Sequence, residues 1–258
     1  MRNILSVAGV VIKELYRRKD FYVLFILIAL ICLIMGAINI FNDNEIIRYL
    51  KAICLLLIWI ASLVIAVTTA ARQIPAEREN RTLLPLLAKP LSRPQLILGK
   101  FAGCWLACGL ALVCFYLFFG VLAATREHHW PLLNYFQAAA LQWFMLGIVV
   151  AVTLLGSLVF AAPSSNATII LVVVAFILFV GHYLNHVALS LGKPLQTIVY
   201  FIYFEIPHLE FFDLRELIVH DWPVIPWLYF NLAVLYALAY TAFFLLVTCV
   251  IFERKPIN

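Results

Sequence analysis

Two features of the sequence bear on whether the chain could do chemistry of its own. His182 and His186 stand four residues apart, a spacing that puts two imidazoles on one face of a helix, within reach of one metal ion. Such a site needs a third or fourth ligand, which the sequence does not identify, so interfacial hydrogen bonding is the favoured interpretation. The sequence also lacks a G-x-x-x-x-G-K-[ST] phosphate loop. We therefore expect no catalytic residue and no cofactor in this chain, with the two histidines as weak candidates for a metal.

The helices that must position these residues are expected to cross a membrane. Of the 258 residues, 66% are hydrophobic and 12% are charged, and the mean hydropathy is +1.04. Soluble domains have about a quarter of their residues charged, so a soluble enzyme and a fused ATPase are both excluded. About 20 helical residues cross a bilayer. The uncharged stretches therefore predict six spans, at 21–41, 52–71, 101–124, 138–161, 168–190 and 227–252. The predicted fold is an all-α integral membrane protein in which residues 1–258 form one transmembrane domain.

Basic residues are distributed unevenly between the connecting segments. With both termini placed inside, thirteen of the 18 Lys and Arg residues lie on the cytoplasmic side and five lie outside. This distribution follows the positive-inside rule. It predicts a multi-pass protein of a bacterial cytoplasmic (inner) membrane, with both termini cytoplasmic. The net charge of +5 then reflects topology and attraction to the anionic inner leaflet, and gives no reason to expect a nucleic-acid partner.

Two segments are expected to lie at the membrane surface. Residues 4–19 place apolar side chains on one helical face and basic ones away from it, which predicts an amphipathic interfacial helix. The alternative is a basic anchor beside the first span. Residues 195–204 are apolar but too short to cross, and are interpreted as an interfacial or re-entrant piece of the outer segment 191–226. The acidic residues of this outer segment are expected to be solvated, with contact to cargo as the alternative.

The cytoplasmic loop 72–100 carries the most informative pattern. Pro75 suits the first turn of a helix, and Glu77 and Glu79 suit the positive N-terminal end of a helix dipole. A short amphipathic helix is therefore predicted after the second span. The alternative is a solvated surface helix that has no partner.

A second helix start is predicted at the end of the same loop. Ser92 and Gln95 have the spacing of a capping box, in which each side chain bonds the backbone N–H of the other residue. Pro94 lies in the first turn that follows. A helix that leads into the third span is therefore expected to begin here.

These loop residues resemble a known family. The runs Glu77-Arg-Glu-Asn-Arg-Thr-Leu83, Ala88-Lys-Pro-Leu-Ser-Arg-Pro-Gln95 and Leu98-Gly-Lys-Phe101 are similar to the loop between the second and third spans of type-2 ATP-binding-cassette (ABC) exporter permeases. The likeness extends over nearly the whole chain. It includes the N-terminal interfacial helix, the six spans and an outer segment that contains Ile206-Pro-His-Leu-Glu-Phe-Phe212.

The resemblance implies how the chain is powered. In that family the loop forms a coupling helix that sits in a groove of a separate ATPase subunit, and two permease subunits pair to form the pathway. We therefore expect three partners: an ABC ATPase that holds ATP and Mg, a second permease subunit, identical or related, and the lipid bilayer. By position, the residues expected to take part in coupling are Glu77, Arg78, Glu79, Arg81, Thr82, Leu83, Leu84, Leu86, Leu87, Pro90, Arg93, Gly99 and Lys100.

The expected function is that of a membrane permease subunit of an ABC exporter, forming half of the translocation pathway. The alternative is a membrane scaffold whose inner loop recruits a cytosolic partner without transport. A secondary transporter is disfavoured because no carboxylate lies in any predicted span. The sequence does not identify the cargo.

Small and polar residues within the spans allow further predictions. Two stripes of small residues permit close helix approach, within one subunit or between subunits, and they are formed by Gly103, Ala107 and Ala111 and by Gly147 and Ala151. Three polar span residues are expected to satisfy one another across helices, with the lining of a path as the alternative: Gln142, Thr153 and Asn231.

Overall fold

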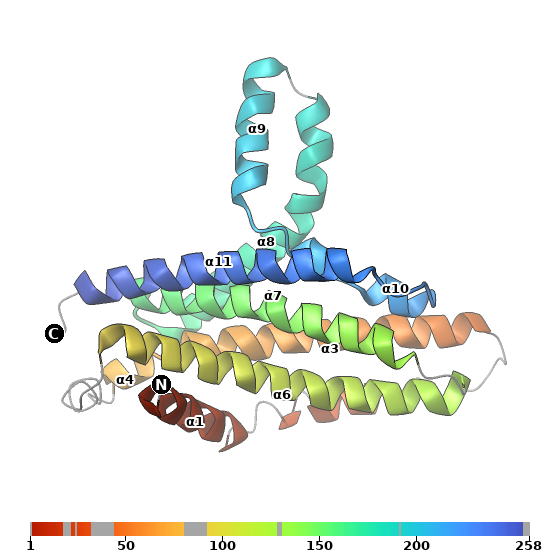
Figure 1. Cartoon of the computed structure of the whole chain (residues 1–258), viewed down its shortest axis with the longest axis horizontal. Coiled ribbons are helices and arrows are strands. Elements are labelled where there is room, and N and C mark those ends of the chain that lie inside the picture. Colours follow the sequence, from red (N-terminus) through yellow and green to blue (C-terminus); the bar gives the residue numbers. More distant parts are fainter. Residues whose placement is uncertain are drawn as a thin grey trace.

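The computed structural model describes residues 2–17, 22–23, 25–31, 44–79, 92–127, 131–190 and 192–254. All secondary-structure elements in these residues are helices (Figure 1). Within them, four stretches are long and apolar enough to cross a membrane: Ile47–Glu77, Arg93–Ala124, Leu132–Val159 and Trp227–Arg254. The all-helical class is therefore confirmed. The count of six spans stays a prediction, because more than half of the first predicted span, 21–41, lies outside the described residues.

The long helices lie side by side and define two ends of the bundle (Figure 1). They are α3 (Asn44–Ala71), α6 (Arg93–Glu127), α7 (Leu132–Val159) and α11 (Trp227–Arg254). The end that holds α4 (Pro75–Glu79), the start of α6 and the last turn of α11 is here called the α4 end. The opposite end, which holds α10 (Arg215–Val219) and the start of α3, is called the α10 end.

The described helices extend beyond the uncharged stretches of the sequence. The third predicted span was expected at 101–124, whereas α6 already begins at Arg93. The reason is the predicted capping box, which the structure confirms: the Ser92 N–H donates to Gln95 Oε1 (3.2 Å) and the Gln95 N–H donates to Ser92 Oγ (3.4 Å). The predicted start of a short helix at Pro75 is confirmed as well.

The N-terminal helix α1 (Arg2–Arg17) packs across α6. Ala8 and Val11 form its buried face, and each is 2% exposed. At the crossing, a Cβ atom built on Gly103 would lie 2.7 Å from Val11 Cβ and 3.0 Å from the Ala8 backbone. Gly103 therefore serves contact within the subunit. Helix α1 covers residues 4–17 of the helix predicted for 4–19, while its place at a membrane surface stays a prediction.

Gly103→Ala is expected to loosen the contact between α1 and α6, because the added methyl group overlaps Val11 and the α1 backbone and the overpacking costs about 1–3 kcal/mol. Trypsin should then cleave after Lys13 several-fold faster in the purified protein. Gly9→Ala is the control, since a Cβ at Gly9 meets no atom within 4 Å. Equal cleavage rates for the two variants would show that the crossing is not tightly packed.

Helices α6 and α7 are joined by a reciprocal tryptophan pair. Trp105 Nε1 donates to the Trp143 carbonyl (2.9 Å), and Trp143 Nε1 donates to the Trp105 carbonyl (2.8 Å). The two rings are stacked, with centroids 4.4 Å apart and planes at 15°. Glycine follows each tryptophan four residues later, at Gly109 and Gly147, and this leaves room for the opposite indole to reach the carbonyl.

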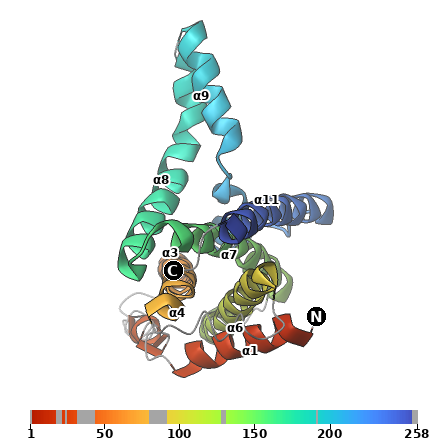
Figure 2. The ribbon, with the colours of Figure 1, turned by 90° about the vertical axis from the view of Figure 1, so that its left-hand side faces the viewer.

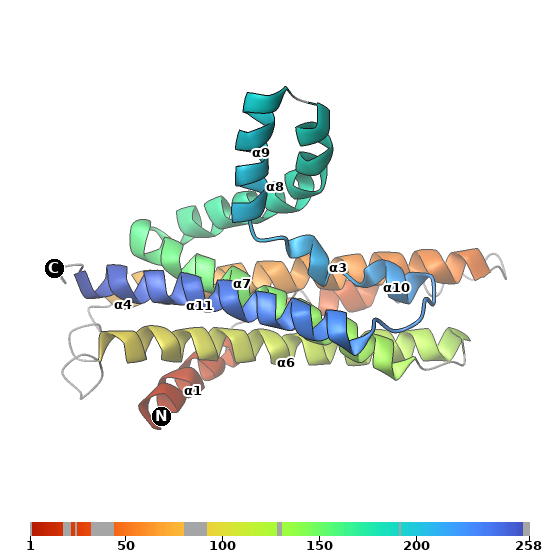
Figure 3. The ribbon, with the colours of Figure 1, turned by 45° about the horizontal axis from the view of Figure 1, so that its top comes forward.

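Helices α8 (Pro163–Ser190) and α9 (Lys193–Glu205) form a hairpin that leaves the side of the bundle. Figure 2 shows α8 diverging from α3, with α9 returning beside it, and Figure 3 shows the hairpin standing away from the long helices. The first half of α8 is fixed to α7, since Asn166 Nδ2 donates to the Thr153 carbonyl (3.1 Å). The apolar piece 195–204 is thus part of a helix, α9, that packs on α8.

Candidate functional site

The α4 end holds a buried cluster of polar side chains that joins two elements of the predicted coupling loop. Lys100 Nζ lies 2.6 Å from Glu77 Oε1 and donates to Gln73 Oε1 (3.1 Å). The Lys100 side chain is 5% exposed and that of Glu77 is 18% exposed. Lys100 lies in α6, Glu77 in α4 and Gln73 in the turn between α3 and α4. One ammonium group therefore binds the short helix to the start of the next long helix.

The local sequence explains why these groups meet. Helix α3 ends at Ala71, and the turn that follows is held by the Gln73 N–H to the Ala70 carbonyl (3.2 Å). Ile74 is 1% exposed and anchors the turn in the core, so Pro75 starts α4 beside α6. The pair formed by Glu77 and Lys100 is then largely removed from water, where loss of one partner leaves an uncompensated charge.

A second cationic side chain ties α6 to the end of α11. Arg93 Nη1 donates to the carbonyls of Phe252 (3.0 Å) and Glu253 (2.9 Å), and its guanidinium carbon lies 5.9 Å from the centroid of the Phe252 ring. The last carbonyls of a helix have no partner within the helix and carry the negative end of its dipole. The Arg93 guanidinium donates to two of these carbonyls and places a positive charge at the negative end of the α11 dipole. The start of α6 is therefore bound to α4 through Lys100 and to α11 through Arg93.

The structure locates only part of the predicted coupling set. Glu77, Arg93 and Lys100 have the contacts described above, and Gly99 is buried in α6. Arg78 and Glu79 belong to α4. The remaining members, outside the described residues, are Arg81, Thr82, Leu83, Leu84, Leu86, Leu87 and Pro90. Their role in coupling stays a prediction. Gln73 was missed by the sequence analysis, because only the fold shows that its side chain reaches Lys100.

The histidine pair contributes no described contact to this end. His182 and His186 belong to the second half of α8, where the structure describes the backbone helix and not these side chains. Their metal role stays a prediction.

The α10 end is closed by residues 205–226, here called the cap segment, which includes η1 (Leu209–Phe212) and α10. Four side chains of the long helices bind this segment. Lys51 Nζ lies 3.0 Å from Asp221 Oδ1, and Asn134 Nδ2 donates to the Trp222 carbonyl (3.0 Å). The Gln137 amide bonds both the N–H and the carbonyl of Ile225 (3.0 and 2.9 Å), and the His208 N–H donates to Tyr236 Oη (2.9 Å). These bonds attach the cap segment to α3, α7 and α11.

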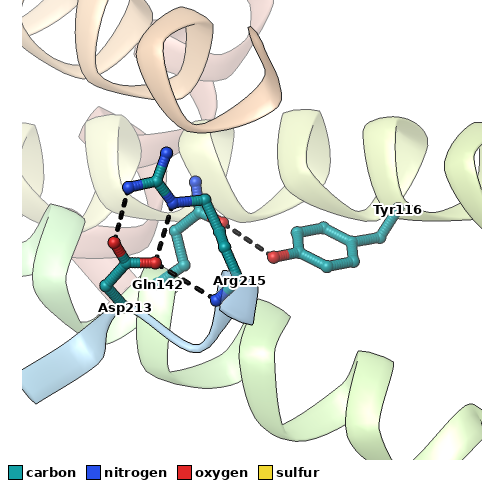
Figure 4. Close-up of polar contacts among 4 residues, drawn as sticks. All are labelled: Tyr116, Gln142, Asp213 and Arg215. Carbon is teal, nitrogen blue, oxygen red and sulfur yellow. Dashed lines mark hydrogen bonds and ion pairs between the residues drawn. The ribbon is translucent and has the colours of Figure 1, made fainter. Parts of the chain in front are cut away.

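The cap segment carries an ion pair into the bundle (Figure 4). Arg215 Nε donates to Asp213 Oδ1 (2.8 Å), and Arg215 Nη2 donates to Asp213 Oδ2 (2.6 Å). These hydrogen bonds raise the pKa of Arg215 above its ordinary value, against a smaller lowering by burial. The guanidinium carbon lies 5.0 Å from the ring centroid of Trp59. Trp59 is eight residues beyond Lys51 along α3, a rise of about 12 Å, so the pair lies away from the tip of the α10 end, with the Arg215 and Asp213 side chains 26% and 27% exposed. Asp213, which was expected to be solvated, is bound by Arg215 and keeps 27% of its side chain exposed.

A chain of hydrogen bonds crosses the bundle next to this pair. Tyr116 Oη donates to Gln142 Oε1 (2.9 Å), Gln142 Nε2 donates to Ser62 Oγ (2.7 Å), and Ser62 Oγ donates to the Trp59 carbonyl (2.8 Å). Figure 4 shows Tyr116 and Gln142 pointing toward one another. The chain joins α6, α7 and α3, and it fixes their relative positions because buried polar groups are costly to leave unsatisfied.

The polar span residues therefore have other partners than the sequence predicted. Thr153 donates from its hydroxyl to the Val149 carbonyl (2.7 Å), within its own helix. Asn231 is exposed on α11. The expectation that Gln142, Thr153 and Asn231 satisfy one another was wrong, since Gln142 pairs with Tyr116 and Ser62.

The small-residue stripes serve contacts inside one chain at the positions where the structure tests them. Gly103 faces α1, as described above. A Cβ built on Gly147 would lie 3.2 Å from Trp105 Nε1 and 3.5 Å from Thr241 Oγ1, on α6 and α11. The alternative of contact within the subunit is therefore the one observed at both glycines.

A family model described as "ABC-2 family transporter protein" matches residues 3–256. This range takes in α1, the α4 end and the cap segment. A search of curated proteins gives no match.

Proposed function

The chain belongs to the ABC-2 family of transporter proteins, and from this membership we propose that it is a permease subunit that exports its cargo with energy from a separate ATPase. Membership in the family supports a permease role in an ABC transporter and makes the chain a transport subunit rather than a catalyst. The proposal adds the direction of transport, the coupling to ATP and the surface through which coupling occurs.

One observation carries the coupling part of the proposal: the buried pair of Glu77 and Lys100 joins α4 to α6 at 2.6 Å. A helix that is docked on a moving ATPase subunit transmits that motion only if it is rigidly connected to the membrane helices. Lys100 supplies a connection to α6, and the turn at Gln73 and Ile74 supplies one to α3. Displacement of α4 would therefore move both helices together.

The proposed orientation places the α4 end in the cytoplasm of a bacterial cell, with the protein in its cytoplasmic membrane. The C-terminal turn of α11 is bound to the start of α6 by Arg93, so the C-terminus would lie on the same side as α4. In this orientation the ABC ATPase, with its ATP and Mg, contacts α4 and the residues that follow it. The cap segment then closes the pathway at the outer face.

A second permease subunit, identical or related, completes the proposed pathway. Among the four described stretches that are long and apolar enough to cross a membrane, the one formed by α11 is the least buried, with 22% of its most apolar part inside the bundle. Its exposed side chains include Leu232, Leu235 and Leu246, and also the amide of Asn231. A surface of this composition is suited to lipid and to a neighbouring helix.

The alternative function is a membrane scaffold that recruits a cytosolic protein through α4 without transport. A cytoplasmic α4 end is common to both functions. Co-purification separates them: an associated chain with a phosphate loop and nucleotide-dependent hydrolysis supports the permease, whereas a partner without ATPase activity supports the scaffold.

Arg81→Glu is expected to leave insertion in the membrane intact and to uncouple ATP hydrolysis from transport, because a reversed charge repels acidic groups on the docked ATPase. The measurement is ATP hydrolysis by the ATPase subunit with and without the variant permease in one membrane preparation. Lys193→Glu, a reversal of an exposed charge at the start of α9, is the control and should behave as wild type. Unchanged coupling in the Arg81 variant would contradict docking at this loop.

A further inference from the structure

We propose that the cavity between α3, α8 and the cap segment binds one zwitterionic phospholipid whose headgroup ends in a primary amine. The cavity has a volume of about 520 Å³, within the range of sites that hold small organic molecules. Residues of α3, of the first part of α8 and of the cap segment line it, and Figure 2 shows α8 diverging from α3. This inference concerns binding by the chain itself and does not depend on ATP-driven transport.

Most of the cavity wall is apolar. Leu63 and Val174 are buried at its base, at 6% and 4% exposure. Leu56, Ile60 and Phe179 also line it, and they are 41%, 47% and 74% exposed. The cavity is therefore open at the surface of the bundle, between two helices whose outer faces are apolar. An acyl chain can enter it from the bilayer, and burial of that chain is favourable on this surface.

The remaining part of the wall is charged and comes from the cap segment. Glu210, Asp213 and Arg215 line the cavity together. Arg215 neutralises Asp213 through two hydrogen bonds made by Nε and Nη2. Its third nitrogen, Nη1, lies outside this pair (Figure 4). Glu210 Oε1 lies 3.6 Å from His208 Nδ1, which is too far for a hydrogen bond but close enough for an ion pair when the imidazole is protonated. The charged wall thus offers a carboxylate acceptor and guanidinium N–H donors next to an apolar space.

These charges discriminate between classes of lipid headgroup. An ammonium group can donate to Glu210, while a phosphate oxygen can accept from Arg215 Nη1, so a zwitterionic aminophospholipid satisfies both. An anionic headgroup without an amine would bring its charge close to two carboxylates and would offer Glu210 no ammonium group. A neutral diacylglycerol would offer neither an ammonium group to Glu210 nor a phosphate oxygen to Arg215 Nη1, so it gains no charged contact in the cavity. Charge complementarity therefore favours the aminophospholipid.

The test is native mass spectrometry of the full chain, purified in detergent and titrated with an equimolar mixture of phosphatidylethanolamine and phosphatidylglycerol with identical acyl chains. We expect one phosphatidylethanolamine to be retained per chain, with at least a several-fold preference over phosphatidylglycerol. Glu210→Gln, which keeps the shape of the side chain and removes its charge, should abolish the preference. Glu216→Gln is the control, since Glu216 is an exposed acid of the same segment that does not line the cavity, and it should keep the preference.

A second pair of variants tests the cavity itself. Ala175→Phe places a ring in the cavity and should remove the retained lipid. Val172→Phe adds the same ring at a position of α8 that does not line the cavity, where Val172 is 63% exposed, and should leave the lipid bound. Equal retention of the two lipids by the wild type would overturn the proposal, and so would a preference that persists in Glu210→Gln. If Ala175→Phe does not fold, the Glu210 variant decides the question alone.

Discussion

Lys100→Met is expected to destabilise the protein by about 3–5 kcal/mol, because it removes one partner of a buried ion pair and leaves the other charge behind. Methionine keeps most of the apolar stem of lysine but has no ammonium group to pair with Glu77 or to donate to Gln73. The thermal midpoint of the purified chain should fall accordingly. If the proposed function holds, the variant permease should also lose its influence on ATP hydrolysis by the partner subunit, since α4 is no longer fixed to α6.

A double-mutant cycle isolates the interaction from other effects of the substitution. Lys100→Met and Glu77→Gln combined should be less destabilising than the sum of the two single changes, because each removes the contact that the other would lose. Arg72→Met is the control: it removes an exposed cation from the turn before α4, and its effect should be within about 0.5 kcal/mol of zero. Additive single effects would contradict the buried connection.

Gly109→Ala is expected to separate the stacked tryptophans, since the new Cβ would lie 2.7 Å from Trp143 Nε1 and 2.9 Å from Trp143 Cε2. The ring cannot yield without breaking its hydrogen bond to the Trp105 carbonyl. We expect a loss of about 1–3 kcal/mol from overpacking and a weaker near-ultraviolet circular dichroism signal from the indole pair.

Three glycines of the two helices provide a graded comparison for this prediction. A Cβ at Gly147 would lie 3.2 Å from Trp105 Nε1, and one at Gly120 would lie 3.7 Å from the Tyr135 ring, which is ordinary contact. The effect should therefore decrease from Gly109→Ala through Gly147→Ala to Gly120→Ala. The last variant should be neutral or stabilising, because alanine favours helix over glycine. The same spectrum for all three variants would show that the tryptophan pair tolerates displacement.

Local features were predicted well where few residues decide them. The Ser92–Gln95 capping box and the start of α4 at Pro75 depend on side-chain and backbone groups within one turn, so the sequence pattern alone predicts them. Helix identity in the spans follows from the same kind of argument, since a long apolar stretch in a bilayer must satisfy its backbone internally. Family membership was indicated by the loop runs, and the family match over residues 3–256 confirms it.

Pairings between distant segments were predicted poorly. The sequence suggested Thr153 and Asn231 as partners for Gln142, but Tyr116 and Ser62 are the ones that the packing of the helices brings within reach. The sequence also left open whether the stripes at Gly103 and Gly147 face another subunit, and the crossing of α1 over α6 decided the first of these.

The charged residues show most clearly which features depend on local sequence and which depend on the packing of distant segments. The sequence by itself determined that the six predicted spans contain no Asp, Glu, Lys or Arg and that the chain is an all-helical protein with apolar helices. It also determined that the loop after the second predicted span carries the family's pattern. Only the tertiary structure decided that Glu77 is paired with Lys100 and that Arg215 is paired with Asp213 at the α10 end. Composition and periodicity depend on neighbouring residues along one helix, whereas an ion pair depends on how two helices are placed in space. The cost of burying a charge then selects the few placements in which each charge has a partner.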